Sequence, residues 1–319
     1  MPAGSKEFRT VATMGAVMVA TQLLALVVAT PFKDAGFQAF EDPSDPMNPL
    51  LYLVAIILFS ALILAIVKLG KKNIIKAIIL FATWAVILDV FLIVFANALY
   101  YGLSVDSWLW EISLALAAVV ASAITYVLVV NPEWYVVNAV GILVGAGVAS
   151  ILGISLWILP MLILLVALAI YDAISVYKTK HMISLADAVT EQHLPVLMVF
   201  PKDEGYSFKE QKGIKEEIDQ GKEREAMFIG LGDIVIPGAL VVSAFINLPP
   251  EYIGEMFKPL LVAAGTMVGI VAGFSVLMRY VLKGNPQAGL PLLNGGAIIG
   301  YAFSYVLLYQ NLTFGISLG

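Results

Sequence analysis

Two aspartates lie within apolar stretches that are long enough to cross a membrane. Asp172 is near the end of the run 156–177, and Asp233 is near the start of the run 226–245. A charged side chain at the centre of a bilayer costs about 2.5 to 3.5 kcal/mol on insertion scales, and such residues usually have a function. Two of them at matching depth indicate a catalytic pair.

Two carboxyl groups that lie close together can divide the work of an acid and a base. At a separation of a few ångströms they do not readily both ionise, so one keeps its proton while the other is charged. The carboxylate then takes a proton from a water that attacks a peptide carbonyl, and the protonated partner donates to the carbonyl oxygen. This is the chemistry of an aspartyl protease.

A single buried aspartate has more ordinary explanations. It often hydrogen-bonds to a neighbouring helix or relays a proton, and for either acid alone these explanations are favoured. Asp89 is such a case, because at 1.5 Å per residue it lies about 22 Å from the inner edge of its apolar run, too deep to join the other two. We expect Asp89 to be structural or to face a local polar pocket.

The composition is that of a membrane protein with many spans. Of the 319 residues, 61% are hydrophobic and only 13% are charged, and the mean hydropathy is +0.93. A spanning helix needs about 20 mostly apolar residues, and unbroken runs favour helices over the alternating strands of a barrel. The sequence predicts an all-α membrane protein with nine transmembrane helices at 11–30, 50–69, 74–97, 108–130, 134–153, 156–177, 226–245, 259–278 and 290–309.

The basic residues fall almost entirely on one side of these spans. Of the 18 Lys and Arg residues, only Lys33 and Lys258 lie on the other side. Because basic loops stay in the cytoplasm, this predicts a cytoplasmic N-terminus and a C-terminus outside. By helical rise, Asp172 then lies about 8 Å and Asp233 about 10 Å from the cytoplasmic boundary. Consecutive antiparallel helices are usually neighbours, so both acids are expected to face one cavity.

Three short motifs, in this order, resemble those of a known family. Tyr171-Asp172, Gly230-Leu231-Gly232-Asp233 and Gly289-Leu290-Pro291 are similar to the three signatures of presenilin-type intramembrane aspartyl proteases, in the presenilin and signal peptide peptidase family. The resemblance covers the whole chain, and the short termini are similar to those of archaeal presenilin homologues. It implies an intramembrane endopeptidase with Asp172 and Asp233 as catalytic residues. The residues that it places in the active-site wall are Tyr171, Gly230, Leu231, Gly232, Gly289, Leu290 and Pro291.

The third motif departs from the family pattern. The family usually reads Pro-Ala-Leu-Pro where this chain has Ala288-Gly289-Leu290-Pro291. Leu290 and Pro291 therefore carry over better than Ala288 and Gly289. A proline near the first turn of a helix is also common for purely structural reasons. The two glycines of the second motif remove side-chain bulk beside the acid, which would permit close helix approach or a bound peptide backbone.

A polar loop divides the expected spans. We expect residues 1–177 to hold the first six, 178–225 to form a cytoplasmic loop, and 226–319 to hold the last three. Inside the loop, 181–200 is typical of an interfacial or gating segment and 201–224 of a solvated linker.

Two parts of the chain near this loop have a predicted role in substrate handling. The hydrophobic stretch 194–200 is either a self-cleavage site, as the resemblance implies, or a lateral lid. A substrate helix must unwind before it is cut, and its extended backbone would pair with an edge strand of the enzyme at 206–208 or 227–229.

Other classes of function fit the sequence less well. With no Cys and two His residues in the chain, we expect no metal or other cofactor, and the net charge of −5 argues against a nucleic-acid partner. A proton- or cation-coupled transporter that uses the same aspartates is the main alternative, although nine spans do not halve into a repeat and the acids lie off the midplane. A noncatalytic scaffold for membrane partners is a third interpretation.

The expected partners are the lipid bilayer of the cell membrane and the transmembrane helices of single-pass proteins. Signal peptide peptidases have the opposite topology, so the charge distribution favours the presenilin orientation and, by analogy, substrates whose N-terminus lies outside. The oligomeric state is left open, with a homo-oligomer among the alternatives.

Overall fold

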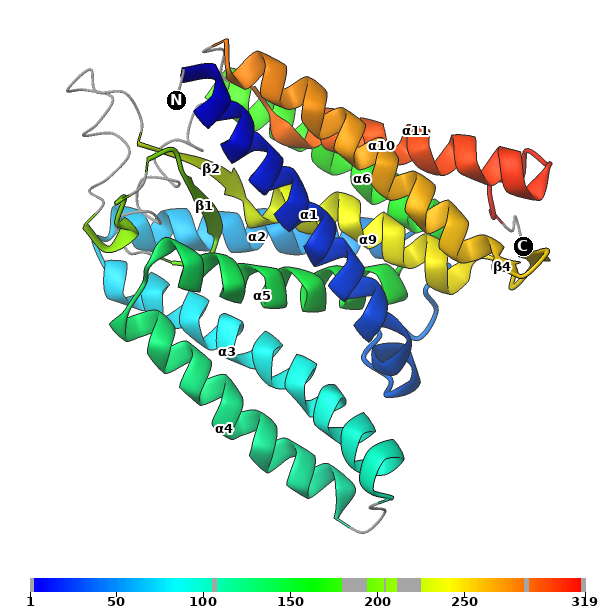
Figure 1. The fold of residues 1–319 in the computed structure, drawn as a ribbon, viewed down its shortest axis with the longest axis horizontal. Coiled ribbons are helices and arrows are strands. Elements are labelled where there is room, and N and C mark those ends of the chain that lie inside the picture. The colour runs from blue at the N-terminus through cyan, green and yellow to red at the C-terminus, as the bar shows by residue number, and fades with distance from the viewer. Residues whose placement is uncertain are drawn as a thin grey trace. The chain divides into compact units, whose positions relative to one another are not determined.

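Helices make up most of the chain in the computed structural model, which describes residues 3–104, 108–179, 194–203, 205–210, 225–283 and 287–316 (Figure 1). In these residues, eight helices are long and apolar enough to cross a membrane, and a ninth apolar helix, α9, is shorter. The prediction of an all-α, multi-pass membrane protein is confirmed. The α-helices are α1 (Ala3–Asp34), α2 (Asn48–Lys68), α3 (Lys72–Asn97), α4 (Leu109–Val130), α5 (Trp134–Ser155), α6 (Ile158–Ile174), α9 (Leu231–Asn247), α10 (Lys258–Val281) and α11 (Gly289–Tyr309).

Short elements connect or extend these helices. Two π-helical turns, η1 and η2, follow α3 and α6, and a 3-10 turn, η3, lies between the first two strands. The four strands form two separate antiparallel pairs, β1 with β2 and β3 with β4. Their bounds are η1 (Ala98–Gly102), η2 (Ser175–Thr179), β1 (Leu197–Pro201), η3 (Phe208–Glu210), β2 (Ala226–Gly230), β3 (Tyr252–Ile253) and β4 (Met256–Phe257).

The seventh apolar run begins as a strand and only then becomes a helix. Residues Ala226–Gly230 form β2, and α9 starts at Leu231. The helix expected from residue 226 is therefore wrong over its first five residues, because alternate residues of this stretch, Met227 and Ile229, pair their backbone groups with β1 instead. Asp233 accordingly lies in the first turn of α9, and its depth cannot be counted by helical rise from residue 226.

One of the two predicted edge strands exists. The stretch 227–229 is confirmed as part of β2, whereas the prediction for 206–208 is wrong. There the Glu133 carboxylate accepts hydrogen bonds from Ser207 Oγ at 2.7 Å and from the Phe208 N–H at 3.1 Å. These bonds stabilise a turn, and the chain enters the 3-10 helix at Phe208.

Two compact units make up the chain. The first unit comprises Met1–Met18, Ser60–Gly147 and Met182–Gly232, and it contains the ribbon formed by β1 and β2. Within it, α3 and α4 lie side by side as a helical hairpin (Figure 1), with Trp84 Nε1 donating to Ser122 Oγ at 3.2 Å.

The strand β1 is buried and fastened to α5 by one side chain. Asn138 Nδ2 donates to the Val199 carbonyl oxygen at 2.7 Å, and the Val199 N–H donates to Asn138 Oδ1 at 2.8 Å. Met198, Val199 and Phe200 are all buried. The last four residues of 181–200, the predicted interfacial or gating segment, therefore lie in a paired strand. Residues 181–193, and 211–224 of the predicted linker, lie outside the described part of the chain.

The second unit comprises Val19–Phe59, Val148–His181 and Asp233–Gly319. Within it, α10 and α11 pack closely against each other (Figure 1). A Cβ added at Gly269 would collide with the backbone of Gly296 and Gly300, and one at Gly273 with the backbone of Leu292. Glycine at these positions lets the two helix backbones approach each other. This packing fixes the half of α11 that follows the third sequence motif.

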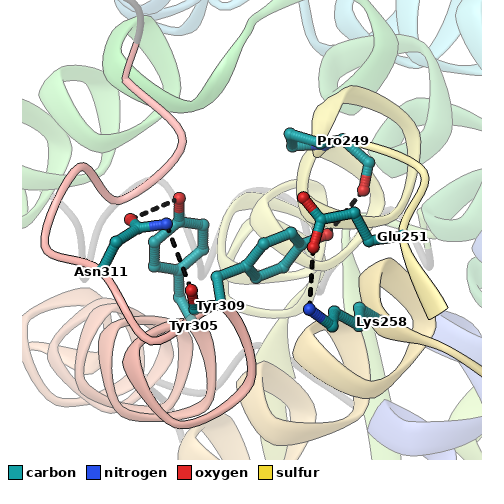
Figure 2. A network of polar contacts seen from close by, with 6 residues as sticks. All are labelled: Pro249, Glu251, Lys258, Tyr305, Tyr309 and Asn311. Carbon is teal, nitrogen blue, oxygen red and sulfur yellow. Dashed lines mark hydrogen bonds and ion pairs between the residues drawn. The ribbon is translucent and has the colours of Figure 1, made fainter. Parts of the chain in front are cut away.

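The far end of α11 is fastened by a polar network (Figure 2). The rings of Tyr305 and Tyr309 stack with their centroids 4.8 Å apart. The Tyr309 hydroxyl donates to the Pro249 carbonyl oxygen at 2.7 Å. Lys258 Nζ lies 5.0 Å from the Tyr309 ring centroid and 2.7 Å from Glu251 Oε2. The segment that joins α9 to α10 is thereby held against α11, so both ends of α11 are fixed.

Candidate active site

Asp172 lies near the C-terminal end of α6 with only 4% of its surface exposed. Its Oδ2 atom accepts a hydrogen bond from the backbone N–H of Leu290 at 3.1 Å. A π-helical turn, η2, follows directly after α6, a local geometry that is frequent at functional sites. The first turn of α11 therefore orients the buried carboxyl group of Asp172.

Asp233 lies directly against Gly289. A Cβ atom added to Gly289 would be 3.1 Å from Cγ, Oδ1 and Oδ2 of Asp233, closer than Cβ atoms normally approach other groups. The carboxyl group of Asp233 thus packs on the backbone of Gly289, and the missing side chain provides the room for it.

Two consecutive residues of the third motif therefore contact the two aspartates. Leu290 donates to Asp172, and Gly289 contacts Asp233. The structure brings the two acids and the third motif together, as expected. It differs from the expectation in one respect, because Gly289, one of the two positions that depart from the family pattern, makes the direct contact with Asp233.

The segment just before α11 is held by a residue that the sequence did not single out. The Tyr177 hydroxyl in η2 donates to Gln287 Oε1 at 2.5 Å, and the Ala288 N–H approaches the same hydroxyl at 3.5 Å. Pro291 lies in the first turn of α11, where backbone N–H groups have no partner within the helix and a residue without one is tolerated. The only sequence signal for Tyr177 and Gln287 was their position beside two of the motifs.

Asn294 links α11 to α6 rather than to the aspartates. Its Nδ2 atom donates to the Leu165 carbonyl oxygen at 2.9 Å, and its side chain is 1% exposed. A buried polar bond between two helices fixes their register, since breaking it would leave unsatisfied groups in an apolar surrounding. Asn294 therefore supports the geometry of the site from one helical turn below the third motif.

The other predicted wall residues have varied surroundings. Tyr171 is half-buried, and as a direct neighbour of Asp172 on a helix its side chain points about 100° away. Gly230 ends β2, and the Leu231 N–H continues the ladder by donating to the Val196 carbonyl oxygen at 2.9 Å. A Cβ added to Gly232 would meet open space, so close helix approach does not explain this glycine.

The fold and the site together define a class: a multi-pass helical membrane protein with two aspartates gathered at the first turn of another helix. Residues 15–309 match a family model described as "Signal-peptide peptidase, presenilin aspartyl protease". The chain belongs to this family of intramembrane aspartyl proteases.

Solved structures of the same family are similar over almost the whole chain. A presenilin family intramembrane aspartate protease in space group C222 is 34% identical with a TM-score of 0.64, and the match covers 93% of this chain and 99% of that chain. A second such structure, in space group P2, is 35% identical with a TM-score of 0.63, and the match covers 92% of this chain and 97% of that chain. No curated protein gives a significant match.

Proposed function

We propose that this protein is an endopeptidase that cuts peptide bonds within the transmembrane helices of single-pass membrane proteins, with Asp172 and Asp233 as its catalytic pair. The observation that carries the proposal is the contact of Gly289 with one carboxyl group and of Leu290 with the other. Since consecutive α-carbons are about 3.8 Å apart, both acids lie beside one short stretch of backbone. That arrangement suits two carboxyl groups that share a proton and act on one water.

In the proposed mechanism, one carboxyl is ionised and the other is protonated when the substrate enters. The carboxylate takes a proton from water, and the water oxygen attacks the carbonyl carbon of the peptide bond. The protonated acid donates to the carbonyl oxygen, which gives a neutral tetrahedral intermediate. Collapse of this intermediate breaks the C–N bond while the carboxyl group that is now protonated donates to the leaving nitrogen and the carboxylate takes a proton from one hydroxyl of the intermediate, which leaves a carboxylic acid and an amine.

The outer edge of β2 is the proposed docking strand for the unwound substrate. Backbone bonds from Leu231 to Val196 and from Lys202 to Glu225 fix which pairs of the β1–β2 ladder are hydrogen-bonded. Because these pairs alternate in an antiparallel ladder, the opposing residues Phe228 and Val199 form a non-hydrogen-bonded pair. The backbone N–H and C=O of Phe228 therefore point away from β1.

The backbone groups on the outer edge of β1 already have a hydrogen-bond partner, whereas β2 continues in sequence into α9, which carries Asp233. On that edge of β1, the Asn138 side chain hydrogen-bonds to both the N–H and the C=O of Val199. Gly230, the last residue of β2, precedes Asp233 by only three positions. A substrate strand paired along β2 would satisfy its freed backbone groups. The open space at Gly232 would then accommodate the substrate backbone.

The orientation and the substrate class belong to the same proposal. The distribution of basic residues supports a cytoplasmic N-terminus in the cell membrane, and with it substrates whose N-terminus lies outside. Self-cleavage at 194–200 remains a prediction. It would require β1 to leave β2, because Met198 and Val199 are buried within this paired strand.

The experiment that tests the proposal measures proteolysis and transport in the same vesicles. The purified chain is reconstituted with a labelled transmembrane peptide, and both peptide products and proton flux are recorded. We expect products that are lost in Asp172→Asn and in Asp233→Asn. Proton flux that depends on the two aspartates, without any peptide product, would instead support the transporter.

A further inference from the structure

A pocket of about 550 Å³, lined by both charged and apolar residues, lies in the first unit. It is formed by the beginning of α1, the first residue of α5 and the turn that follows β1. The side chains relevant to binding are those of Arg9, Thr10, Trp134, Lys202, Asp203 and Tyr206.

The lining of this pocket combines positive charge with interfacial aromatic residues. Arg9 and Lys202 carry two positive charges against the single carboxylate of Asp203 among the lining residues. Arginine presents a planar set of donors that fits phosphate oxygens, and lysine adds a second positive charge. Trp134 and Tyr206 are of the residue types that gather at the boundary between membrane and water.

We infer that this pocket binds the phosphate group of an anionic phospholipid. Basic pockets between helices at the membrane surface are suited to such headgroups. The cytoplasmic ends of single-pass substrates are typically basic, so Arg9 and Lys202 would repel them rather than hold them. The charge therefore favours a lipid over the substrate as the occupant.

The same pocket is connected to the β1–β2 ribbon. Phe200 and Pro201 at the end of β1 line it, and Thr10 Oγ1 on α1 donates to the Pro201 carbonyl oxygen at 3.3 Å. A bound headgroup would tie α1 to the turn after β1 and so stabilise the strand that pairs with β2. On the function proposed above, an occupied pocket increases the rate of substrate cleavage.

The test replaces the two basic residues together and compares lipid binding with activity. Full-length protein is prepared with Arg9→Gln/Lys202→Gln, and a matched control carries Arg279→Gln/Lys283→Gln, which removes the same charge from the exposed end of α10. Each is equilibrated in phosphatidylcholine vesicles with and without about 20% phosphatidylglycerol. Retained phosphatidylglycerol is counted by mass spectrometry, and peptide cleavage is measured in parallel.

We expect the wild type and the control to retain phosphatidylglycerol and to cleave several-fold faster in its presence. The pocket variant should bind it about tenfold more weakly and lose the stimulation. Equal retention by the pocket variant and the control would overturn the inference.

Two further arms separate the alternatives. Lipid retention is also measured on Asp172→Asn, so binding is read even where no cleavage occurs and the two proposals can fail independently. Soluble glycerol phosphate is added to phosphatidylcholine vesicles. If it stimulates cleavage as strongly as the lipid while no phosphatidylglycerol is retained from mixed vesicles, a free phosphate rather than a lipid is the ligand, and the lipid assignment is wrong.

Discussion

Gly289 lies against the carboxyl group of Asp233, at a distance where even a single added methyl group would be crowded. The next residue, Leu290, donates its backbone N–H to Asp172. The positions of both acids therefore depend on the same turn of backbone at the start of α11, and small changes in that turn should alter activity more than stability.

Proteolytic activity should fall progressively as the side chain at position 289 becomes larger. In Gly289→Ala, the added Cβ would push the Asp233 carboxyl group by a few tenths of an ångström. The related family usually carries Ala at this position, so we expect kcat/KM to fall by less than about tenfold. Gly289→Val adds two branches toward the acid and should lose about 100-fold, as misplacements near 1 Å typically do. The control is Gly295→Val, whose added Cβ meets open space on the same helix. Equal activity of the two valine variants would contradict the assignment.

The backbone N–H of Leu290 should contribute to catalysis separately from its side chain. Leu290→Pro removes the donor to Asp172 in the first helical turn, where proline is tolerated, whereas Leu290→Ala keeps it. A hydrogen bond to a charged group is worth about 1.5 to 3 kcal/mol, so the proline variant should be about 10- to 100-fold less active than the alanine variant. If the two variants show the same kcat, this bond does not orient the acid.

Tyr177 and Gln287 should act as one positioning unit. Their side-chain bond ties η2 to the segment before α11, and Tyr177 is 54% exposed, so Tyr177→Phe should change the melting temperature little. We expect Tyr177→Phe and Gln287→Ala each to lower kcat several-fold, and the double variant to be no worse than the worse single one. A double-mutant cycle on kcat measures this coupling, and strictly additive losses would show that the two residues act independently.

The outer edge of β2 should be needed for substrate and not for folding. Phe228→Pro removes an outward-facing N–H while leaving the ladder to β1 intact, and Phe228→Ala keeps the N–H as its control. The proline variant should raise KM for a transmembrane peptide relative to the alanine variant at a similar melting temperature. Unchanged cleavage by Phe228→Pro would rule out strand pairing along β2.

Much of the fold could be read from the sequence because hydrocarbon imposes strict requirements. Long apolar runs identify spanning helices, and carboxylates inside them are costly enough that Asp172 and Asp233 stand out. The change from strand to helix at Leu231 was only partly predicted, since the sequence placed 227–229 both within a spanning helix and among the candidate edge strands. A short apolar stretch such as 226–230 suits either structure. Only its pairing with β1, distant in the sequence, decides the outcome.

The details of the site were less predictable for a related reason. The contact of Gly289 with Asp233 depends on how α11 packs on its neighbours, and a glycine gives no sign of which group will occupy the space beside it. The bond between Tyr177 and Gln287 joins residues 110 positions apart and has no periodic pattern. The bond from Asn294 to the Leu165 carbonyl likewise joins residues 129 positions apart.

The central claim is that Asp172 and Asp233 together hydrolyse peptide bonds within the membrane. The most direct measurement is the yield of cleaved transmembrane peptide, by mass spectrometry, for wild type, Asp172→Asn, Asp233→Asn and the matched control Asp89→Asn, an aspartate on α3 in the other unit. We predict that wild type and Asp89→Asn give the same products, and that either catalytic variant lowers the rate at least about 1,000-fold, because each acid is needed in every turnover. Products formed at an undiminished rate by Asp172→Asn or by Asp233→Asn would contradict the account.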